Sequence, residues 1–146
     1  MKRECGFSLL ELLIVVAIIL IIATIAIPSL LRSRQSANEA SAVSNIRTVN
    51  IEEATYSVSA GGNFATIGAL VTAGMLDSRF NGSVSGYRFT ITVSGPDYTV
   101  LGTPTGLNSG RYGYYSTPDG VIRYQTATST TCNPCFPSGL SGSPVK

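Results

Sequence analysis

Glu11 is the ionisable residue whose position most limits what the chain can do, because it lies inside a long apolar stretch. Between Leu9 and Ile27 the only other polar residue is Thr24. A carboxylate in hydrocarbon costs about 2.5–3.5 kcal/mol on insertion scales, so Glu11 must be protonated or must find a cation. An acid in this setting is a candidate functional residue that needs a partner.

The rest of the sequence offers little for catalysis. The 146 residues include no His, which removes the commonest general base and metal ligand and any Ser–His or Cys–His pair. Among the acids beyond residue 27 only Glu52 and Glu53 are adjacent, and adjacent side chains on a helix do not face each other. We therefore expect a protein that is not an enzyme and that has no metal site and no cofactor.

Two of the three cysteines, Cys132 and Cys135, lie close together near the C-terminus. Residue 136 is Phe, so the haem-attachment pattern Cys-x-x-Cys-His is absent, and zinc would need four ligands. A redox pair of the thioredoxin kind would lie at the start of a helix rather than in a tail that contains proline. Outside the cytoplasm we expect the two thiols to form a small local disulfide.

The residues from Phe7 to Ile27 are long and apolar enough to cross a membrane. As a helix they span roughly 30 Å, and Lys2 and Arg3 ahead of them predict a cytoplasmic N-terminus. A secretory signal cleaved after Ala26, a plain membrane anchor and a leader removed before the apolar stretch all fit this pattern. Only the last has a use for Glu11, since a signal or an anchor gains nothing from a carboxylate.

The segment Gly6-Phe7-Ser8-Leu9-Leu10-Glu11-Leu12 resembles the prepilin cleavage motif of type IV pilins and pseudopilins. The resemblance covers about residues 2–31 and includes Pro28, at the position where the helix of that family usually bends. It implies that a membrane-embedded aspartic peptidase removes residues 1–6 as a leader by cutting after Gly6. The same enzyme then methylates the new amine of Phe7.

The resemblance also implies that Glu11 pairs with the Phe7 amine of a neighbouring subunit during assembly. The cut creates this amine, monomethylation keeps it charged, and it is the only cation at the depth of Glu11. Phe7 and Glu11 also lie one helical turn apart, so a bond within one chain is possible. Removal of the leader takes Cys5 away and leaves Cys132 and Cys135 as a pair.

One long helix is expected over residues 7–58, with residues 7–31 as its transmembrane or filament-core part. Pro28 has no N–H and clashes with the carbonyl of Thr24, so we expect a kink there. Beyond it, apolar residues that recur at helical spacing predict a half-buried face against a sheet. These residues are Ala40, Val43, Ile51, Ala54 and Val58, and Arg47 interrupts them.

Residues 59–146 are expected to form a globular head with a tail that is flexible from about residue 127. Gly61 and Gly62 end the long helix, and a short helix is predicted from Thr66 to Met75, with Thr66 as its cap and Gly74 at its end. Alternating apolar and polar residues predict four antiparallel strands, at residues 87–93, 98–101, 111–116 and 121–124. The predicted fold class is therefore α+β, with the long N-terminal helix packed on a four-stranded antiparallel sheet, and the resemblance implies the same pilin fold.

Together these features predict a structural filament subunit, because an apolar rod joined to a compact head can be buried against copies of itself. The resemblance implies a type IV pilus that serves adhesion, twitching motility, DNA uptake or biofilm formation. The expected partners are other copies in a helical filament, the prepilin peptidase and methyltransferase, and the inner-membrane assembly machinery. The chain would cross the bacterial inner membrane once before assembly and would become extracellular in the filament.

Two other functions fit the sequence less well. The first is a pseudopilin of a type II secretion system, but the major pseudopilin carries an acidic calcium loop near its C-terminus, and here Asp119 is the only acid after Asp97. The second is a membrane-anchored secreted binding module. Nucleic-acid binding has no support, because the net charge is only +2 and the arginines are scattered.

Overall fold

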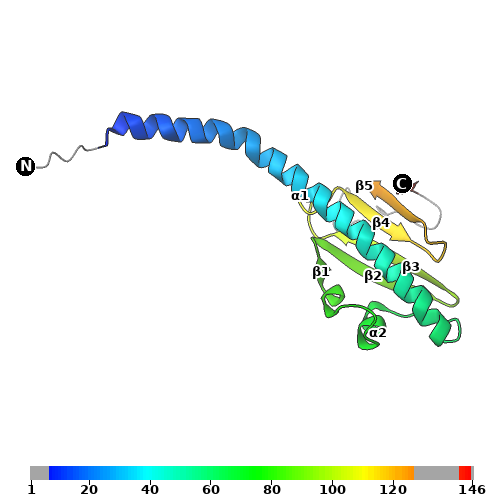
Figure 1. Cartoon of the computed structure of the whole chain (residues 1–146). Coiled ribbons are helices and arrows are strands. Elements are labelled where there is room, and N and C mark those ends of the chain that lie inside the picture. The colour runs from blue at the N-terminus through cyan, green and yellow to red at the C-terminus, as the bar shows by residue number, and fades with distance from the viewer. Residues whose placement is uncertain (1–6, 127–141, 146) are drawn as a thin grey trace, which may run out of the picture. The chain divides into compact units, whose positions relative to one another are not determined.

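The computed structural model describes residues 7–126 and 142–145, and helix α1 (Leu9–Ser59) is its largest element (Figure 1). The chain divides into two compact units, residues 1–33 and residues 34–146, and α1 contributes to both. In the first unit, α1 is the one element that the described residues form. The second unit contains the rest of α1 together with a sheet and two short helices.

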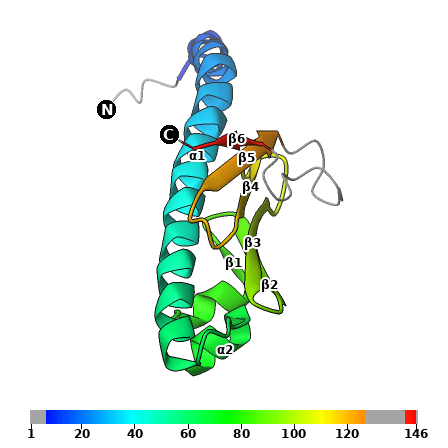
Figure 2. The ribbon, with the colours of Figure 1, turned by 90° about the vertical axis from the view of Figure 1, so that its right-hand side faces the viewer.

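The sheet of the second unit is antiparallel, and each strand pairs with its neighbours in sequence. The strands are β1 (Ser83–Val84), β2 (Tyr87–Ser94), β3 (Asp97–Pro104), β4 (Tyr112–Ser116), β5 (Ile122–Thr126) and β6 (Ser143–Pro144). Figure 2 shows the second half of α1 running along one face of this sheet. The predicted α+β fold, a long helix on an antiparallel sheet, is therefore confirmed.

The four predicted strands correspond to β2 to β5, and the prediction missed β1 and β6. Each of these two has only two residues, which is too short for a visible alternation. β1 pairs with β2 because Ser85 and Gly86 have φ angles of 50° and 74°, the two positive values of a type I′ hairpin turn. β6 lies in the stretch expected to be flexible, and it pairs with Arg123 and Tyr124 of β5.

Two short helices lie between α1 and the sheet in sequence, namely α2 (Ile67–Thr72) and the 3₁₀-helix η1 (Ser78–Asn81). Thr66 caps α2, because its Oγ1 accepts a hydrogen bond from the Ala69 N–H at 3.4 Å. The prediction of a helix that starts after Thr66 is confirmed, although the helix ends at Thr72 rather than at Met75.

The face of α1 that the head buries differs from the predicted one. The buried side chains recur at intervals of three and four residues: Glu39, Ala42, Ile46, Val49 and Glu53. Four members of the predicted face are exposed instead: Ala40, Ala54, Ile51 over 63% and Val58 over 86% of its surface. The apolar pattern predicted the wrong face because charged residues stand at both ends of the buried stripe.

The hydrophobic core forms where Ala42, Ile46 and Val49 meet the inner face of the sheet. The strands contribute mainly aromatic and branched side chains: Tyr87, Phe89, Ile91, Tyr98, Val100, Tyr114 and Ile122. Gly102 of β3 allows the helix to come close, since a Cβ atom there would lie 3.1 Å from Ile46 Cδ1. Helix and sheet are thus packed directly against each other at the centre of the head.

Replacement of Ile46 by Ala should destabilise the head, whereas the same replacement at Ile51 should not. Ile46 is fully buried, and the cavity left by a large-to-small change in a core costs about 2–5 kcal/mol. Ile51→Ala is the matched control, since a change at an exposed position alters the free energy of unfolding by about 0.5 kcal/mol or less. Urea unfolding of the full chain in detergent micelles, followed by tyrosine fluorescence, measures both. Equal effects would contradict the assignment of the buried face.

Candidate functional site

Ser8 and Glu11 together cap the N-terminal end of α1. The Ser8 N–H donates to Glu11 Oε2 at 3.3 Å, and the Leu10 N–H donates to Ser8 Oγ at 3.3 Å. This arrangement is close to a capping box, with Leu10 rather than Glu11 donating to Ser8, and it provides acceptors for N–H groups that a helix leaves without partners at its start. A carboxylate in the first turn also interacts favourably with the helix dipole. Glu11 therefore has a local role in its own chain.

The sequence analysis missed this cap, although its signal, a Ser three residues before a Glu, was present. Pairing of Glu11 with the amine of Phe7 would be a second and separate role, and it stays a prediction. Phe7 is 80% exposed, and Gly6, the other residue of the predicted cleavage site, lies outside the described residues. The capping and charge-pairing contributions of Glu11 therefore need separate tests.

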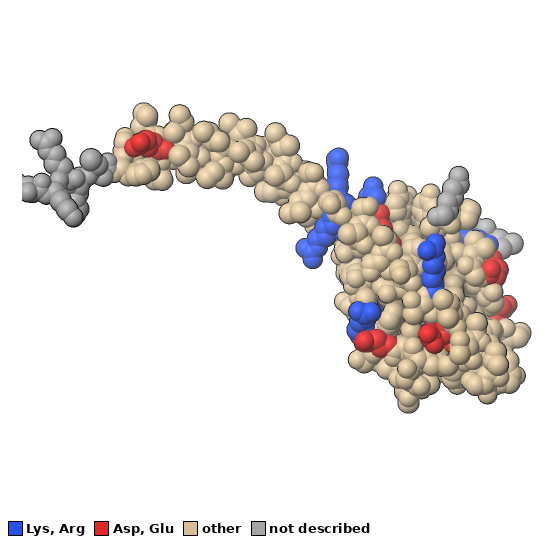
Figure 3. All heavy atoms as spheres, in the orientation of Figure 1, with Lys and Arg blue, Asp and Glu red and all other residues tan. Residues whose placement is uncertain are grey.

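The first part of α1 presents an apolar surface on all sides. Its large apolar side chains from Leu9 to Leu31 are exposed over 39–79% of their surface. Figure 3 shows this length of helix free of charge except for one acidic group near its start. By length and composition, α1 contains a stretch that could cross a membrane. A helix that is apolar on all sides requires an apolar environment, such as lipid or other helices.

α1 continues as a helix through Pro28. The Thr24 hydroxyl donates to the Ile21 carbonyl at 2.7 Å, so this side chain uses the helix backbone as its partner. The kink predicted at Pro28 stays a prediction.

Two amide side chains join the head part of α1 to the loop between β3 and β4. Gln35 Nε2 donates to the Leu107 carbonyl at 2.9 Å, and Asn38 Nδ2 donates to the Ser109 carbonyl at 2.9 Å. Because a loop has few partners for its backbone within the sheet, these side chains supply the donors that its carbonyl groups need.

Glu39 completes this junction through Arg111, which follows the same loop. Glu39 Oε1 accepts hydrogen bonds from the Arg111 backbone N–H at 2.7 Å and from Arg111 Nε at 3.1 Å, and Glu39 Oε2 accepts one from Nη2 at 2.9 Å. The hydrogen bonds to Glu39 raise the pKa of Arg111 above its ordinary value. The two-pronged geometry fixes the direction of the guanidinium as well as its charge.

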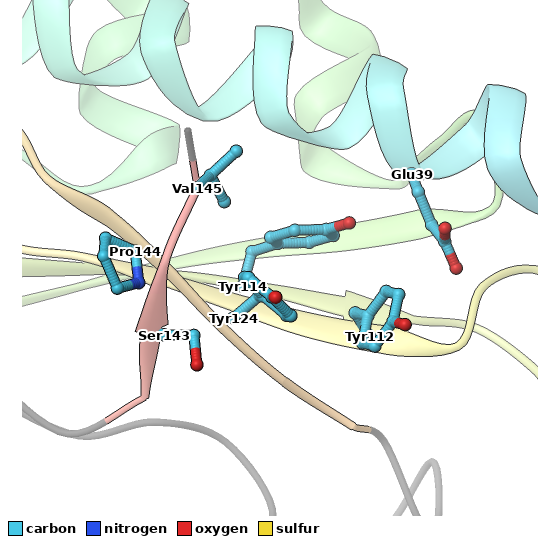
Figure 4. Close-up of a pocket in the computed structure, with 7 residues that line it drawn as sticks. All are labelled: Glu39, Tyr112, Tyr114, Tyr124, Ser143, Pro144 and Val145. Atoms are coloured by element: carbon cyan, nitrogen blue, oxygen red, sulfur yellow. The ribbon is translucent and has the colours of Figure 1, made fainter.

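A pocket of about 540 Å³ lies beside Glu39 on the head. Figure 4 shows the tyrosine rings between the residues of the C-terminal strand and Glu39. The lining residues are Glu39, Tyr112, Tyr114, Tyr124, Ser143, Pro144 and Val145. Tyrosines beside a carboxylate form a setting that attracts a cation. Arg111 already supplies one, since its Cζ lies 5.2 Å from the centre of the Tyr112 ring and its guanidinium binds Glu39.

Glu53 holds the segment that follows α1. Its side chain is fully buried, and Oε2 accepts a hydrogen bond from the Ala65 N–H at 3.0 Å. Oε1 has no hydrogen-bond partner among the described residues. Burial raises the pKa of Glu53 above its ordinary value of 4.5, and the hydrogen bond from Ala65 offsets only part of this effect. The head therefore favours the protonated form of this carboxyl group.

A polar network lies on the same side of the core. The Tyr98 hydroxyl donates to Asn50 Oδ1 at 3.2 Å, and Asn50 Nδ2 donates to Ser116 Oγ at 2.8 Å. Burial raises the pKa of Tyr98 to about 12, and the charge of Glu53 contributes in the same direction. The network thus connects α1 with β3 and β4 without adding a charge.

Asp119 and Arg123 form another ion pair among the described residues of the head. Arg123 Nη2 donates to Asp119 Oδ2 at 2.7 Å. This hydrogen bond, aided by those from the Thr117 hydroxyl and the Val121 N–H, lowers the pKa of Asp119 to about 2. The pair fixes the turn between β4 and β5.

Several predicted site residues lie outside the part of the chain that the structure describes. These are Gly6, Cys132 and Cys135, so the disulfide stays a prediction. Within residues 7–126 and 142–145, no group of three or more His, Cys, Asp or Glu side chains is placed to hold a metal ion.

Comparison with known proteins agrees with the N-terminal motif and with the layout of the whole chain. Residues 1–27 match the family model of the prokaryotic N-terminal methylation motif. Over 132 residues the chain is 29% identical to the type IV wide pilus major component PilA4 of Thermus thermophilus. The alignment covers 90% of this chain and 95% of that relative. No solved structure gives a significant match.

The methylation motif lies at the start of an apolar helix, and an antiparallel head follows that helix. Together with the alignment over nearly the whole length of a pilus component, this arrangement makes the chain similar to a type IV pilus subunit.

Replacement of Glu53 by Gln should flatten the dependence of head stability on pH. Because the folded pKa of Glu53 is raised, the folded head binds this proton more tightly than the unfolded chain, so stability falls as pH rises above about 4.5. Asp119 acts in the opposite direction, since its contribution is lost as pH falls from about 4 toward 2. Urea unfolding of the full chain in micelles from pH 4 to 8 measures the difference.

The matched control for this measurement is Glu52→Gln, which changes the adjacent and more exposed carboxylate. We expect it to keep the pH profile of the unmodified chain. The interpretation of Glu53 fails if the two variants give the same slope between pH 5 and 8.

Proposed function

We propose that the chain is a structural subunit of an extracellular type IV pilus and that it is not an enzyme. The observation that carries this proposal is the methylation motif at the start of a helix whose apolar side chains are exposed from Leu9 to Leu31. An exposed apolar surface of this size must be buried against lipid or against other protein. Lipid covers it before assembly, and the helices of other subunits cover it in the filament.

The relative in Thermus thermophilus is named as a major component of a wide pilus, which supports a main filament subunit. In this role the head covers the outside of the fibre and mediates adhesion, twitching motility, DNA uptake or biofilm formation. A pseudopilin is not favoured, because the similarity extends over 95% of a pilus component.

Before assembly, the proposed subunit lies in the inner membrane, with residues 7–31 across the bilayer and residues 1–6 in the cytoplasm. The prepilin peptidase removes this leader and methylates Phe7, and the assembly machinery then transfers the subunit to the filament. In the filament core, the carboxylate of Glu11 neutralises the Phe7 amine of a neighbour. Either charge left unpaired in that apolar core would cost several kcal/mol.

The mature chain should begin at Phe7 and carry a methylated amine. This expectation follows from the cleavage motif within the matched residues 1–27. Intact-mass measurement of the subunit from sheared filaments, with N-terminal sequencing, tests it. A mature chain that begins at Ile27 would indicate an ordinary secretory signal and would overturn the filament function.

Substitutions at Glu11 and Ser8 should separate the charge of Glu11 from its capping role. Glu11→Gln keeps an oxygen that can accept the Ser8 N–H but removes the charge, whereas Glu11→Ala removes both. We expect filaments to be absent or rare in both variants, with the leader still cleaved and the head folded. Electron microscopy of filaments from the native host measures assembly, and circular dichroism of the purified subunit measures folding.

Ser8→Ala is the control for this experiment. It removes the hydroxyl that caps the Leu10 N–H, at a cost of about 0.5–2 kcal/mol in helix stability, and leaves the Glu11 charge in place. We expect near-normal filament numbers. Normal numbers in Glu11→Gln would instead show that the cap suffices and that charge pairing is not required.

A further inference from the structure

Two arginines mark the point where the apolar length of α1 ends. No basic side chain occurs from residue 7 to residue 31, and Arg32 and Arg34 then follow within three residues. Both side chains are exposed. Figure 3 shows basic side chains at the end of the uncharged length of the helix. We call Arg32 and Arg34 the arginine collar.

The arginine collar has no protein partner among the described residues. Neither arginine takes part in a side-chain hydrogen bond or an ion pair there. The sequence of α1 contains no acid between Glu11 and Glu39, and Glu39 is already used by Arg111. Gln35 is the first residue beyond the collar that bonds to the head. The two guanidinium groups are therefore available to a partner from outside the chain.

The position of the collar along the helix matches the thickness of a membrane. From Phe7 to Arg32 is 25 residues, which as a helix is about 38 Å. A bilayer has a hydrocarbon core of about 30 Å and measures about 40–45 Å with its headgroups. With Phe7 at one interface, the collar therefore lies among the headgroups at the other. Long arginine side chains near the end of a membrane helix reach to this level readily.

The placement of the two arginines around the helix suits a partner that surrounds the helix. Residues two apart on an α-helix point in nearly opposite directions, about 200° apart. A single protein surface on one side of α1 would reach only one of them. Lipid headgroups surround a membrane helix on all sides and reach both.

We propose that Arg32 and Arg34 bind phosphate groups of membrane lipids at the outer face of the inner membrane and hold the unassembled pilin at a fixed depth. The inference rests on the membrane stage of the proposed function. A guanidinium group is always charged and matches two phosphate oxygens with two parallel N–H donors. Assembly then requires that the collar leave its lipid phosphates as the apolar helix leaves the bilayer.

The test uses the full mature chain in vesicles of phosphatidylethanolamine and phosphatidylglycerol, with arginine labelled by ¹³C at Cζ. Solid-state NMR measures the loss of ¹³C signal caused by nearby ³¹P nuclei. We expect a clear loss for a fraction of the arginine signal in the unmodified chain. The fraction should disappear in the double variant Arg32→Lys and Arg34→Lys, which keeps both charges but removes the labelled carbons at the collar.

The matched control is the double variant Arg79→Lys and Arg88→Lys, which removes two exposed arginines of the head. It should retain the ³¹P-dependent loss in full. The proposal is overturned if the collar variant keeps this loss, or if the unmodified chain shows none. A sample in phosphate buffer with detergent and no phospholipid separates the two sources of phosphate, and an equal loss there would overturn the assignment to lipid.

Flotation of the same vesicles on a density gradient separates failure of this inference from failure of the proposed function. A chain that floats with the vesicles but shows no contact between the collar and phosphorus overturns the collar alone. A chain that does not float overturns the membrane stage and the collar with it.

Discussion

The packing of the second half of α1 against the sheet is the interaction on which the rest of the head depends. Ala42, Ile46 and Val49 supply its apolar contact, and Glu39 and Glu53 stand at either end of the same buried face. Burying a carboxylate is costly unless it finds donors. Both carboxylates accept a hydrogen bond from a backbone N–H in a segment without regular structure. α1 thus holds the two loops that pairing within the sheet cannot hold.

The two parts of α1 are suited to different environments. Up to Leu31 the exposed side chains are almost all apolar, and the structure gives them no cover. From Gln35 onward, one face of the helix is buried against the sheet, and polar side chains reach the loops of the head. Both parts of the sequence are compatible with a helix. The environment that each part requires is therefore set by the polarity of its side chains and not by a break in the helix.

The sequence predicted the features that depend on local chemistry. The long helix, the Thr66 cap and strands β2 to β5 follow from periodicity and capping residues, and the structure contains them. The features that depend on tertiary contacts were harder to predict. The buried face of α1 was predicted wrongly because Glu39 and Glu53 become compatible with burial only when Arg111 and Ala65, distant in sequence, provide donors.

The prediction of site residues can likewise be divided into features that the local sequence indicates and features that depend on tertiary contacts. Glu11 was recognised as unusual because of its apolar neighbours, and the motif around it agrees with the matched family model. Its hydrogen bond with Ser8 was missed, although that contact is local and the spacing was visible. β1 and β6 could not be predicted, because a two-residue strand exists only through its partner: a type I′ turn makes the first, and pairing with β5 makes the second.

The order of contacts along α1 has a mechanical consequence. A pull on α1 along its axis from the N-terminal side reaches Gln35, Asn38 and Glu39 before it reaches the apolar contacts of Ala42 and Ile46. These three side chains hold one loop through several hydrogen bonds, one of them part of an ion pair. Tension is therefore shared among polar contacts at the edge of the head, and the core behind them stays shielded until those contacts yield.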